Sequence, residues 1–164
     1  MSLDFPPVVG RKKRILIVDD DEMVRQFVAT LLTNEGVQVR TASNGEAGLR
    51  VLNHYPADLV VVDLGMPLMD GFGFIGALRA RSNMEDLPVV VVTGRDLNPS
   101  EEAFLEQEAH AILHKGSEVS RKLPEVVASV PIRPENLASP GIAPPPEPGS
   151  VTAEIRPLDV IAEP

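Results

Sequence analysis

The chain has 164 residues, a formal net charge of −9 and no cysteine. This length suits one domain of roughly 120 residues with additional segments. The acidic balance argues against a nucleic-acid surface, and the missing thiols exclude a disulfide framework or a thiolate metal site. No apolar stretch has the length of a signal peptide or a membrane helix, so we expect a cytoplasmic protein that binds neither membrane nor nucleic acid.

Five short apolar runs organise the chain after a leader, residues 1–11, that contains Pro6-Pro7 and lacks periodicity. The basic cluster at residues 11–14 is either a solvated flank or a partner-binding element. Near-continuous β-branched runs of this length are typical of strands buried on both faces of a parallel sheet. The runs are Ile15–Val18, Val37–Val39, Leu59–Val62, Val89–Val92 and Ala111–Leu113.

Helical patterns separate these runs. Apolar residues repeat at helical spacing from Val24 to Leu32, and Gly36 supplies a stop. Further helices are expected from Asn44-Gly45 to Leu52, from Asp70-Gly71 to Arg81, from Pro99 onward, and over Glu118–Val130, where Pro124 predicts a late start or a kink. Alternating strands and helices predict an α/β fold with a parallel sheet, formed by residues 12–130.

The remaining segment, residues 131–164, has nine prolines and few apolar residues. Such a composition cannot bury enough apolar surface to offset the entropy of ordering the chain. We therefore expect an acidic, proline-rich, disordered tail. It is either an inert extension or a docking segment for a partner.

Polar residues follow four of the apolar runs, at the carboxyl end of each expected strand. They are Asp19-Asp20-Asp21, Asp63, Thr93 and Lys115. Ligands of parallel α/β sheets bind beyond these strand ends, so the four groups should converge on one crevice. Capping of the next helix explains Asp21. The adjacent carboxylates of Asp19 and Asp20 repel each other unless a cation joins them, and Mg²⁺ suits such a ligand set.

Asp63 is either a solvent-facing turn residue or a nucleophile toward phosphorus. The second interpretation is chemically reasonable because a metal ion held by neighbouring carboxylates would offset the charge repulsion. Thr93 offers a hydroxyl, and Gly94 leaves room for a phosphoryl group. Lys115 supplies a cation for a carboxylate or a phosphoryl oxygen.

The sequence resembles the receiver domains of response regulators from two-component signalling. The resemblance covers about residues 14–130 and rests on four motifs in the family's order: Ile15-Leu16-Ile17-Val18-Asp19-Asp20-Asp21, Asp63-Leu64-Gly65-Met66-Pro67-Leu68-Met69-Asp70-Gly71, Val92-Thr93 and His114-Lys115. It implies a doubly wound, flavodoxin-like fold with five parallel strands in the order 2-1-3-4-5.

The resemblance also implies the chemistry of the site. Asp63 would accept a phosphoryl group from a phosphohistidine of a histidine kinase or phosphotransfer protein. Mg²⁺ would be bound by Asp19, Asp20, Asp63 and the backbone carbonyl of Gly65, while Thr93 and Lys115 would contact the phosphoryl oxygens. The chain would then be a signalling module without its own output domain, and its only reactions would be its own phosphorylation and dephosphorylation.

Two positions depart from the family's pattern. Proline usually follows the lysine, where this chain has Gly116, and an aromatic residue usually stands three before it, where this chain has Ile112. Because isoleucine has no ring to swing between buried and exposed positions, we expect a weak output relay. Phosphorylation would then change mainly the loops around Gly65, Gly94 and Gly116.

Two other functions use related residues. A phosphatase of the haloacid-dehalogenase type combines Asp, Thr, Lys and Mg²⁺, but its nucleophile is followed two residues later by a second aspartate, where this chain has Gly65. A binding module that no longer needs phosphorylation would be compatible with Ile112 and Gly116.

Overall fold

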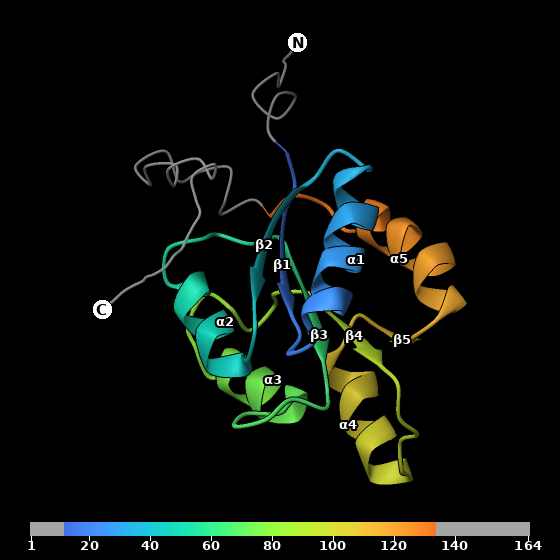
Figure 1. Ribbon diagram of the computed structural model, residues 1–164. Coiled ribbons are helices and arrows are strands. Elements are labelled where there is room, and N and C mark those ends of the chain that lie inside the picture. The colour runs from blue at the N-terminus through green and yellow to red at the C-terminus, as the bar shows by residue number, and fades with distance from the viewer. Residues whose placement is uncertain (1–11, 134–164) are drawn as a thin grey trace.

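The computed structural model describes residues 12–133, in which five strands alternate with five helices (Figure 1). The elements are β1 (Arg14–Val18), α1 (Glu22–Thr33), β2 (Gln38–Ala42), α2 (Gly45–Leu52), β3 (Leu59–Asp63), α3 (Gly71–Arg79), β4 (Val89–Thr93), α4 (Pro99–Glu108), β5 (Ala111–His114) and α5 (Ser117–Ser129). The predicted leader, and the predicted tail beyond residue 133, lie outside the described residues. Within residues 12–133, every helix is too short or too polar to cross a membrane.

The strands form one parallel sheet in the order β2-β1-β3-β4-β5, which confirms the predicted fold class. Its register pairs Val18 with Val62, then Asp63 with Val92, then Thr93 with His114. The carboxyl ends of these strands therefore meet at one edge of the sheet, where the polar strand-end residues were expected to converge.

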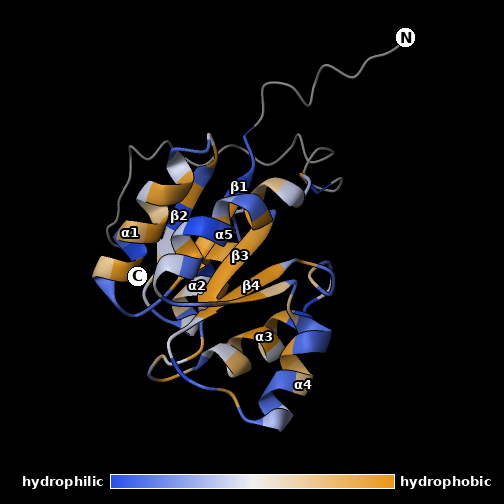
Figure 2. Cartoon of the chain, turned by 90° about the vertical axis from the view of Figure 1, so that its right-hand side faces the viewer, coloured by the Kyte–Doolittle hydropathy of each residue, from blue (hydrophilic) through white to orange (hydrophobic). Residues whose placement is uncertain are grey.

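Two helical layers cover the sheet (Figures 1 and 2). Alternate strand residues face opposite sides: Ile15 and Ile17 belong to the core under α1 and α5, whereas Leu16 and Val18 belong to the core under α2, α3 and α4. All five residues of β3 and of β4 are buried. This two-sided burial explains the uninterrupted apolar runs in the sequence.

Three predicted boundaries differ from the structure. β2 extends to Ala42, three residues past the expected end, because this edge strand continues through polar residues that its exposed surroundings tolerate. α3 ends at Arg79, two residues early, where the Arg79 guanidinium turns to donate to the carbonyls of the following loop. α5 begins at Ser117 and not late, because Val119, Leu123 and Val127 form a buried stripe on both sides of Pro124.

A buried tyrosine ties the edge strand to its neighbour. The Tyr55 hydroxyl lies 3.3 Å from the carbonyl oxygen of Gln38 on β2 and 3.5 Å from that of Ile15 on β1. The guanidinium carbon of Arg40 lies 5.0 Å from the ring centroid.

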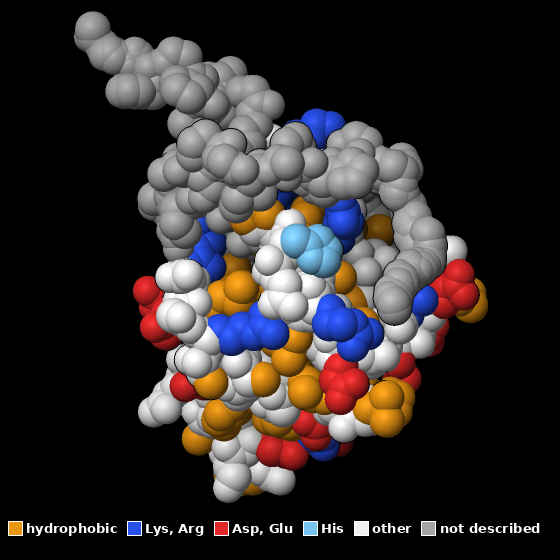
Figure 3. All heavy atoms as spheres, turned by 90° about the vertical axis from the view of Figure 1, so that its left-hand side faces the viewer, with side chains coloured by type: hydrophobic (Ala, Val, Ile, Leu, Met, Phe, Trp, Pro, Cys, Tyr) orange, Lys and Arg blue, Asp and Glu red, His pale blue; other side chains and the backbone are white. Residues whose placement is uncertain are grey.

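On the side of the molecule where α2 lies, Lys and Arg side chains lie mostly toward the middle and acidic ones toward the margins (Figure 3).

A buried aspartate at the amino end of β3 joins both ends of the described chain. Asp58 accepts hydrogen bonds from the backbone N–H of Arg14, at 2.8 Å, and of Arg133, at 2.9 Å. Arg133 also donates through its guanidinium to the carbonyl of Asn83, at 2.9 Å. Residues 131–133, which we assigned to the tail, thus lie against the domain.

Candidate functional site

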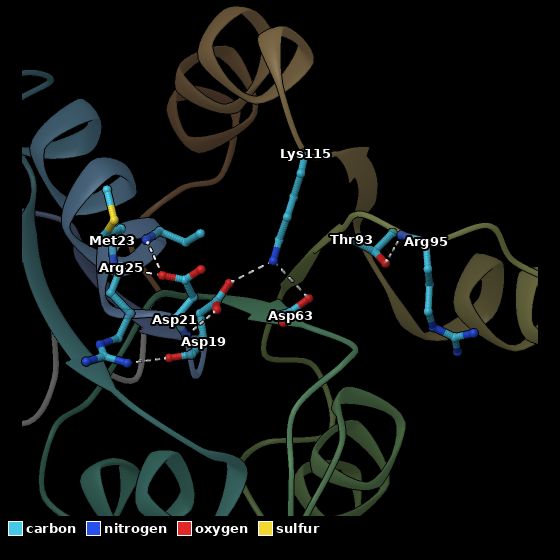
Figure 4. A network of polar contacts seen from close by, with 9 residues as sticks. Asp19, Asp21, Met23, Arg25, Asp63, Thr93, Arg95 and Lys115 are labelled. Carbon is cyan, nitrogen blue, oxygen red and sulfur yellow. Dashed lines mark hydrogen bonds and ion pairs between the residues drawn. The ribbon is translucent and has the colours of Figure 1, made fainter.

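Three carboxylates meet where β1 and β3 end, and Figure 4 shows two of them, those of Asp19 and Asp63. Asp19, Asp20 and Asp63 each offer one oxygen, and these oxygens lie within 4.8 Å of one another. Asp19 and Asp63 are buried and Asp20 is exposed, so the cluster opens to solvent on one side. The pairing of Val18 with Val62 explains the juxtaposition, because Asp19 and Asp63 follow these two neighbours in the chain.

Lys115 reaches into this cluster from the end of β5 (Figure 4). Its Nζ lies 3.4 Å from Oδ2 of Asp19 and 3.5 Å from Oδ1 of Asp63. Partial burial alone would lower the pKa of Lys115, but the charges of the two aspartates raise it overall, so the amine stays protonated. The structure thus joins the lysine and the carboxylates that the sequence predicted to converge.

The three carboxylates and Lys115 do not balance one another's charge. Three carboxylates contribute −3 and Lys115 contributes +1, which leaves −2. Burial, followed by the negative charge of Asp63, raises the pKa of Asp19, although the backbone N–H of Asp21 and the Lys115 ammonium oppose the rise. A divalent cation that prefers oxygen ligands fits both the geometry and the charge of these residues.

Contacts at the start of α1 fix Asp19 and Asp21. The Asp21 side chain accepts from the backbone N–H of Met23, at 2.9 Å, and of Val24, at 3.4 Å, which confirms its predicted capping role. Arg25 was missed by sequence analysis: its guanidinium donates to the backbone carbonyl of Asp19, at 2.7 Å. A basic residue one turn into the helix that follows an aspartate pair was the available signal.

Thr93 lies buried at the end of β4. Its Oγ1 accepts a hydrogen bond from the backbone N–H of Arg95, at 3.2 Å (Figure 4). A Cβ added at Gly94 would lie 3.6 Å from the Lys115 side chain, so the glycine keeps the space beside the lysine open. Gly65 is exposed in the loop after β3, and its role as a carbonyl ligand stays a prediction.

Two glycines meet strict backbone demands near the site. A Cβ at Gly71 would lie 2.6 Å from the carbonyl oxygen of Asp63, so only glycine lets α3 begin this close to the end of β3. Gly116 adopts a φ of 118°, which a proline ring cannot reach. The departure from the usual lysine-proline pair therefore matches the backbone found here.

The chain is similar to known proteins. The family model of the response regulator receiver domain matches residues 15–127 of the sequence. The chain is 34% identical over 88 residues to a probable chemotaxis protein CheY of Rhizobium etli, covering 53% of this chain and 68% of that protein. It is 42% identical over 84 residues to a probable transcriptional regulator ycf27 of Pyropia yezoensis, covering 51% of this chain and 33% of the relative. The match thus spans about a third of that longer relative.

Solved structures extend the comparison. Chemotaxis protein CheY4 of Vibrio cholerae superposes with a TM-score of 0.67 at 27% identity, covering 73% of this chain and 99% of that one. The response regulator TrrA of Thermotoga maritima, solved in complex with Mg²⁺-BeF, gives 0.63 at 29% identity, covering 71% and 97%. With the matched residues, the strand order and the acidic cluster in agreement, the chain belongs to the response regulator receiver domain family.

Proposed function

We propose that the chain is a phosphoacceptor of two-component signalling, in which Asp63 receives a phosphoryl group from a phosphohistidine of a histidine kinase or phosphotransfer protein. The observation that carries the proposal is the position of Asp63, buried at the end of a central strand, beside two other carboxylates and 3.5 Å from the Lys115 ammonium. Family membership supports it, since receivers act as phosphoacceptors in general.

In this proposal a carboxylate oxygen of Asp63 attacks the phosphorus atom. The phosphorus–nitrogen bond breaks, and its electron pair remains on the imidazole nitrogen. Thr93 donates its hydroxyl to one phosphoryl oxygen, and Lys115 pairs with another while leaving its carboxylate partners. Thr93 is the last residue of β4 and Lys115 follows the last residue of β5, and these two strands are neighbours in the sheet, which supports their joint action.

Mg²⁺ would be held by Asp19, Asp20, Asp63 and the Gly65 carbonyl. When bound, it supplies positive charge at the phosphoryl oxygens. The carboxylates of this chain orient it, and the Arg25 guanidinium and the Asp21 backbone N–H keep Asp19 in place. The Mg²⁺-BeF complex of the Thermotoga maritima relative supports this assignment.

Apolar side chains around the site suit a protein donor. Met23 is 79% exposed on the first turn of α1, Phe27 lies one turn further on, and Leu68 in the loop after β3 is 85% exposed. Residues four apart lie on the same face of a helix. We assign these side chains to the surface that meets the phosphohistidine-bearing partner.

Incubation with acetyl phosphate, a small-molecule phosphoryl donor, tests the proposal. With Mg²⁺, intact-mass measurement should show the wild-type chain gaining the mass of one phosphoryl group. Asp63→Asn keeps the shape of the side chain but removes the nucleophile, so it should gain none. Chelation of Mg²⁺ should remove most of the wild-type signal.

Exposed Asp96 offers a matched control, because Asp96→Asn removes the same charge outside the cluster and should leave phosphorylation unchanged. An adduct of equal yield in Asp63→Asn would contradict the proposal. Sustained turnover of acetyl phosphate without an adduct would favour a phosphatase, and no reaction would favour a binding module.

A further inference from the structure

Helix α4 is weakly anchored along its length. Of its ten residues, Leu105 alone is buried, and the helix carries the acidic residues Glu101, Glu102, Glu106 and Glu108. Most of the stability of a short helix comes from packing of an apolar face. The position of α4 therefore depends strongly on the contacts made at its two ends.

The carboxyl end of α4 is held by Arg79 of α3. The guanidinium donates to the backbone carbonyl of Glu108, at 2.7 Å, and to its Oε1, at 3.2 Å. The same group donates to the carbonyls of Met84 and Leu87, which fixes it to the loop before β4. Arg79 thus anchors this end of α4 to two other parts of the domain.

The amino end is held by a second arginine, Arg95, which lies in the loop between β4 and α4. Its guanidinium donates to Oε2 of Glu101, at 2.8 Å, and its central carbon lies 5.7 Å from the ring centroid of Phe72 on α3. The Phe72 ring in turn lies 5.9 Å from that of Phe104 on α4. We call Phe72, Arg95, Glu101 and Phe104 the Arg95 cluster.

Glu101 belongs at the same time to the cap of α4. Its Oε1 accepts from the backbone N–H of Asn98, and the Asn98 side chain accepts from the backbone N–H of Glu101. This reciprocal pair stabilises the first turn of the helix. A displacement of Arg95 therefore changes the environment of the capping carboxylate itself.

The Arg95 cluster also connects to the phosphoacceptor site, because the Arg95 backbone N–H donates to the Thr93 hydroxyl, at 3.2 Å. Only one residue separates these two positions. Ile112, which replaces the usual aromatic residue, packs against the core beneath α2, α3 and α4. The route through Arg95 does not require a ring at position 112.

We propose that Arg95 is a positioning residue that couples the Thr93 hydroxyl to helix α4. Movement of Thr93 toward a phosphoryl group on Asp63 draws the Arg95 backbone with it, withdraws the guanidinium from Glu101 and Phe72, and lets the amino end of α4 pivot about Arg79. The phosphoryl trigger rests on the proposed function. The sequence prediction drawn from Ile112, that phosphorylation changes mainly the loops around Gly65, Gly94 and Gly116, is the alternative that the experiments distinguish from this coupling.

The first test needs no phosphoryl group. Amide hydrogen exchange is compared among the wild type, Thr93→Val, Arg95→Ala and the double variant. Each single change should speed exchange in the first turns of α4 by roughly two- to fivefold, as expected for loss of a partly exposed ion pair. The double variant should match Arg95→Ala alone, because Thr93 acts through Arg95. Arg121→Ala removes an exposed arginine of α5 and should change nothing in α4.

An unchanged α4 in either single variant, or effects that multiply in the double variant, would overturn the coupling. A second measurement follows amide chemical shifts on adding Mg²⁺ and beryllofluoride, a phosphoryl mimic. In the wild type and in Arg121→Ala, the amide signals of Thr93 and of α4 should shift. In Arg95→Ala the signal of Thr93 should shift and those of α4 should not. Equal α4 shifts in Arg95→Ala would overturn the proposal. A wild type without shifts near Asp63 would instead count against the phosphoacceptor function, and hydrogen exchange would still decide the coupling.

Discussion

Asp19 experiences an electrostatic conflict within the site. It is buried beside Asp63, and these two influences raise its pKa, while the Lys115 ammonium relieves the conflict only in part. A carboxyl group whose pKa is raised by folding destabilises the folded state once it is ionised. At neutral pH and without a cation, the site therefore costs the domain stability.

Replacing this carboxylate should make the metal-free domain more stable. We expect Asp19→Asn to raise the melting temperature at neutral pH in the presence of a chelator by a few degrees, since about 1 kcal/mol corresponds to roughly 2–8 °C for domains of this size. Saturating Mg²⁺ should stabilise the wild type by roughly 2.7 kcal/mol at a hundredfold excess over Kd, and the variant far less.

Thermal unfolding by circular dichroism measures both effects. Asp96→Asn again serves as control, because it removes a carboxylate that is exposed and lies outside the cluster. A lower melting temperature of Asp19→Asn without metal would show that its contact with Lys115 outweighs the repulsion from Asp63.

Residue chemistry explains which parts of the site were predictable. Asp19, Asp63 and Lys115 end apolar runs, so strand polarity alone brings them together. Arg25 and Arg95 act through a backbone carbonyl and a hydroxyl whose positions depend on the local turn. Arg25 had only the weak signal of a basic residue in the first turns after an aspartate pair, and Arg95 had no such signal in the sequence.

Among the elements, the edge strand β2 depends on Tyr55. The hydroxyl bonds to the carbonyls of β1 and β2, and burial raises the pKa of Tyr55, so the neutral form is the one that folding selects. Because the pKa of Tyr55 is higher in the folded state, its contribution to the free energy of unfolding is fully present below 10.0, the pKa of the phenol in the unfolded chain. This contribution is lost as the pH rises above that value toward the folded-state pKa.

Tyr55→Phe should separate these contributions. We expect a loss of about 1 kcal/mol at neutral pH, because the single hydroxyl proton that two carbonyl oxygens share, at 3.3 Å and 3.5 Å, is removed. Above pH 10.0 the difference in the free energy of unfolding between wild type and variant should narrow. Ionisation of the phenol, once unfolding exposes it, stabilises the unfolded state of the wild type only. Urea denaturation at several pH values gives the free energies.

Absorbance of the chain's single tyrosine follows its ionisation directly. The phenol should titrate only with unfolding, above the range of a free tyrosine. Ionisation near the ordinary value in the folded protein would contradict this account. The hydroxyl would then be accessible to solvent in the native state.

Element boundaries were least predictable where packing is one-sided. The central strands are buried on both faces, and their apolar runs fixed them to within a residue. β2 lies at the sheet edge and mixes polar with apolar residues, so its run in the sequence marked only part of it. In α5, buried contacts override the poor helix propensity of Pro124, which local sequence cannot reveal.

At the scale of the molecule, Asp58 joins segments that are far apart in the sequence. Asp58→Asn would place amide hydrogens against one of the two backbone N–H donors, which leaves a partly buried donor without its acceptor. We expect a loss of about 1–3 kcal/mol, read as a lower urea midpoint. Asp86→Asn, at an exposed position, is the matched control.

Truncation probes the same contact from the other side. A chain ending at Arg133 keeps the N–H that donates to Asp58 and should melt like the full-length protein, whereas one ending at Val130 should melt at a lower temperature. The first result follows from the predicted disorder of the tail, which stays a prediction. Equal melting temperatures for both truncated chains would rule out a stabilising role for residues 131–133.

The Asp58 carboxylate has a consequence for modular architecture. Its two oxygens bind the backbones of Arg14 and Arg133, so the entry and exit of the domain are neighbours. Both lie by the amino end of β3, whereas Asp63 lies at the opposite end of the same strand. A further polypeptide can therefore be fused before Arg14 or after Arg133, or the whole domain can be inserted into a loop of another protein. In each case the end of the sheet that carries Asp63 stays accessible.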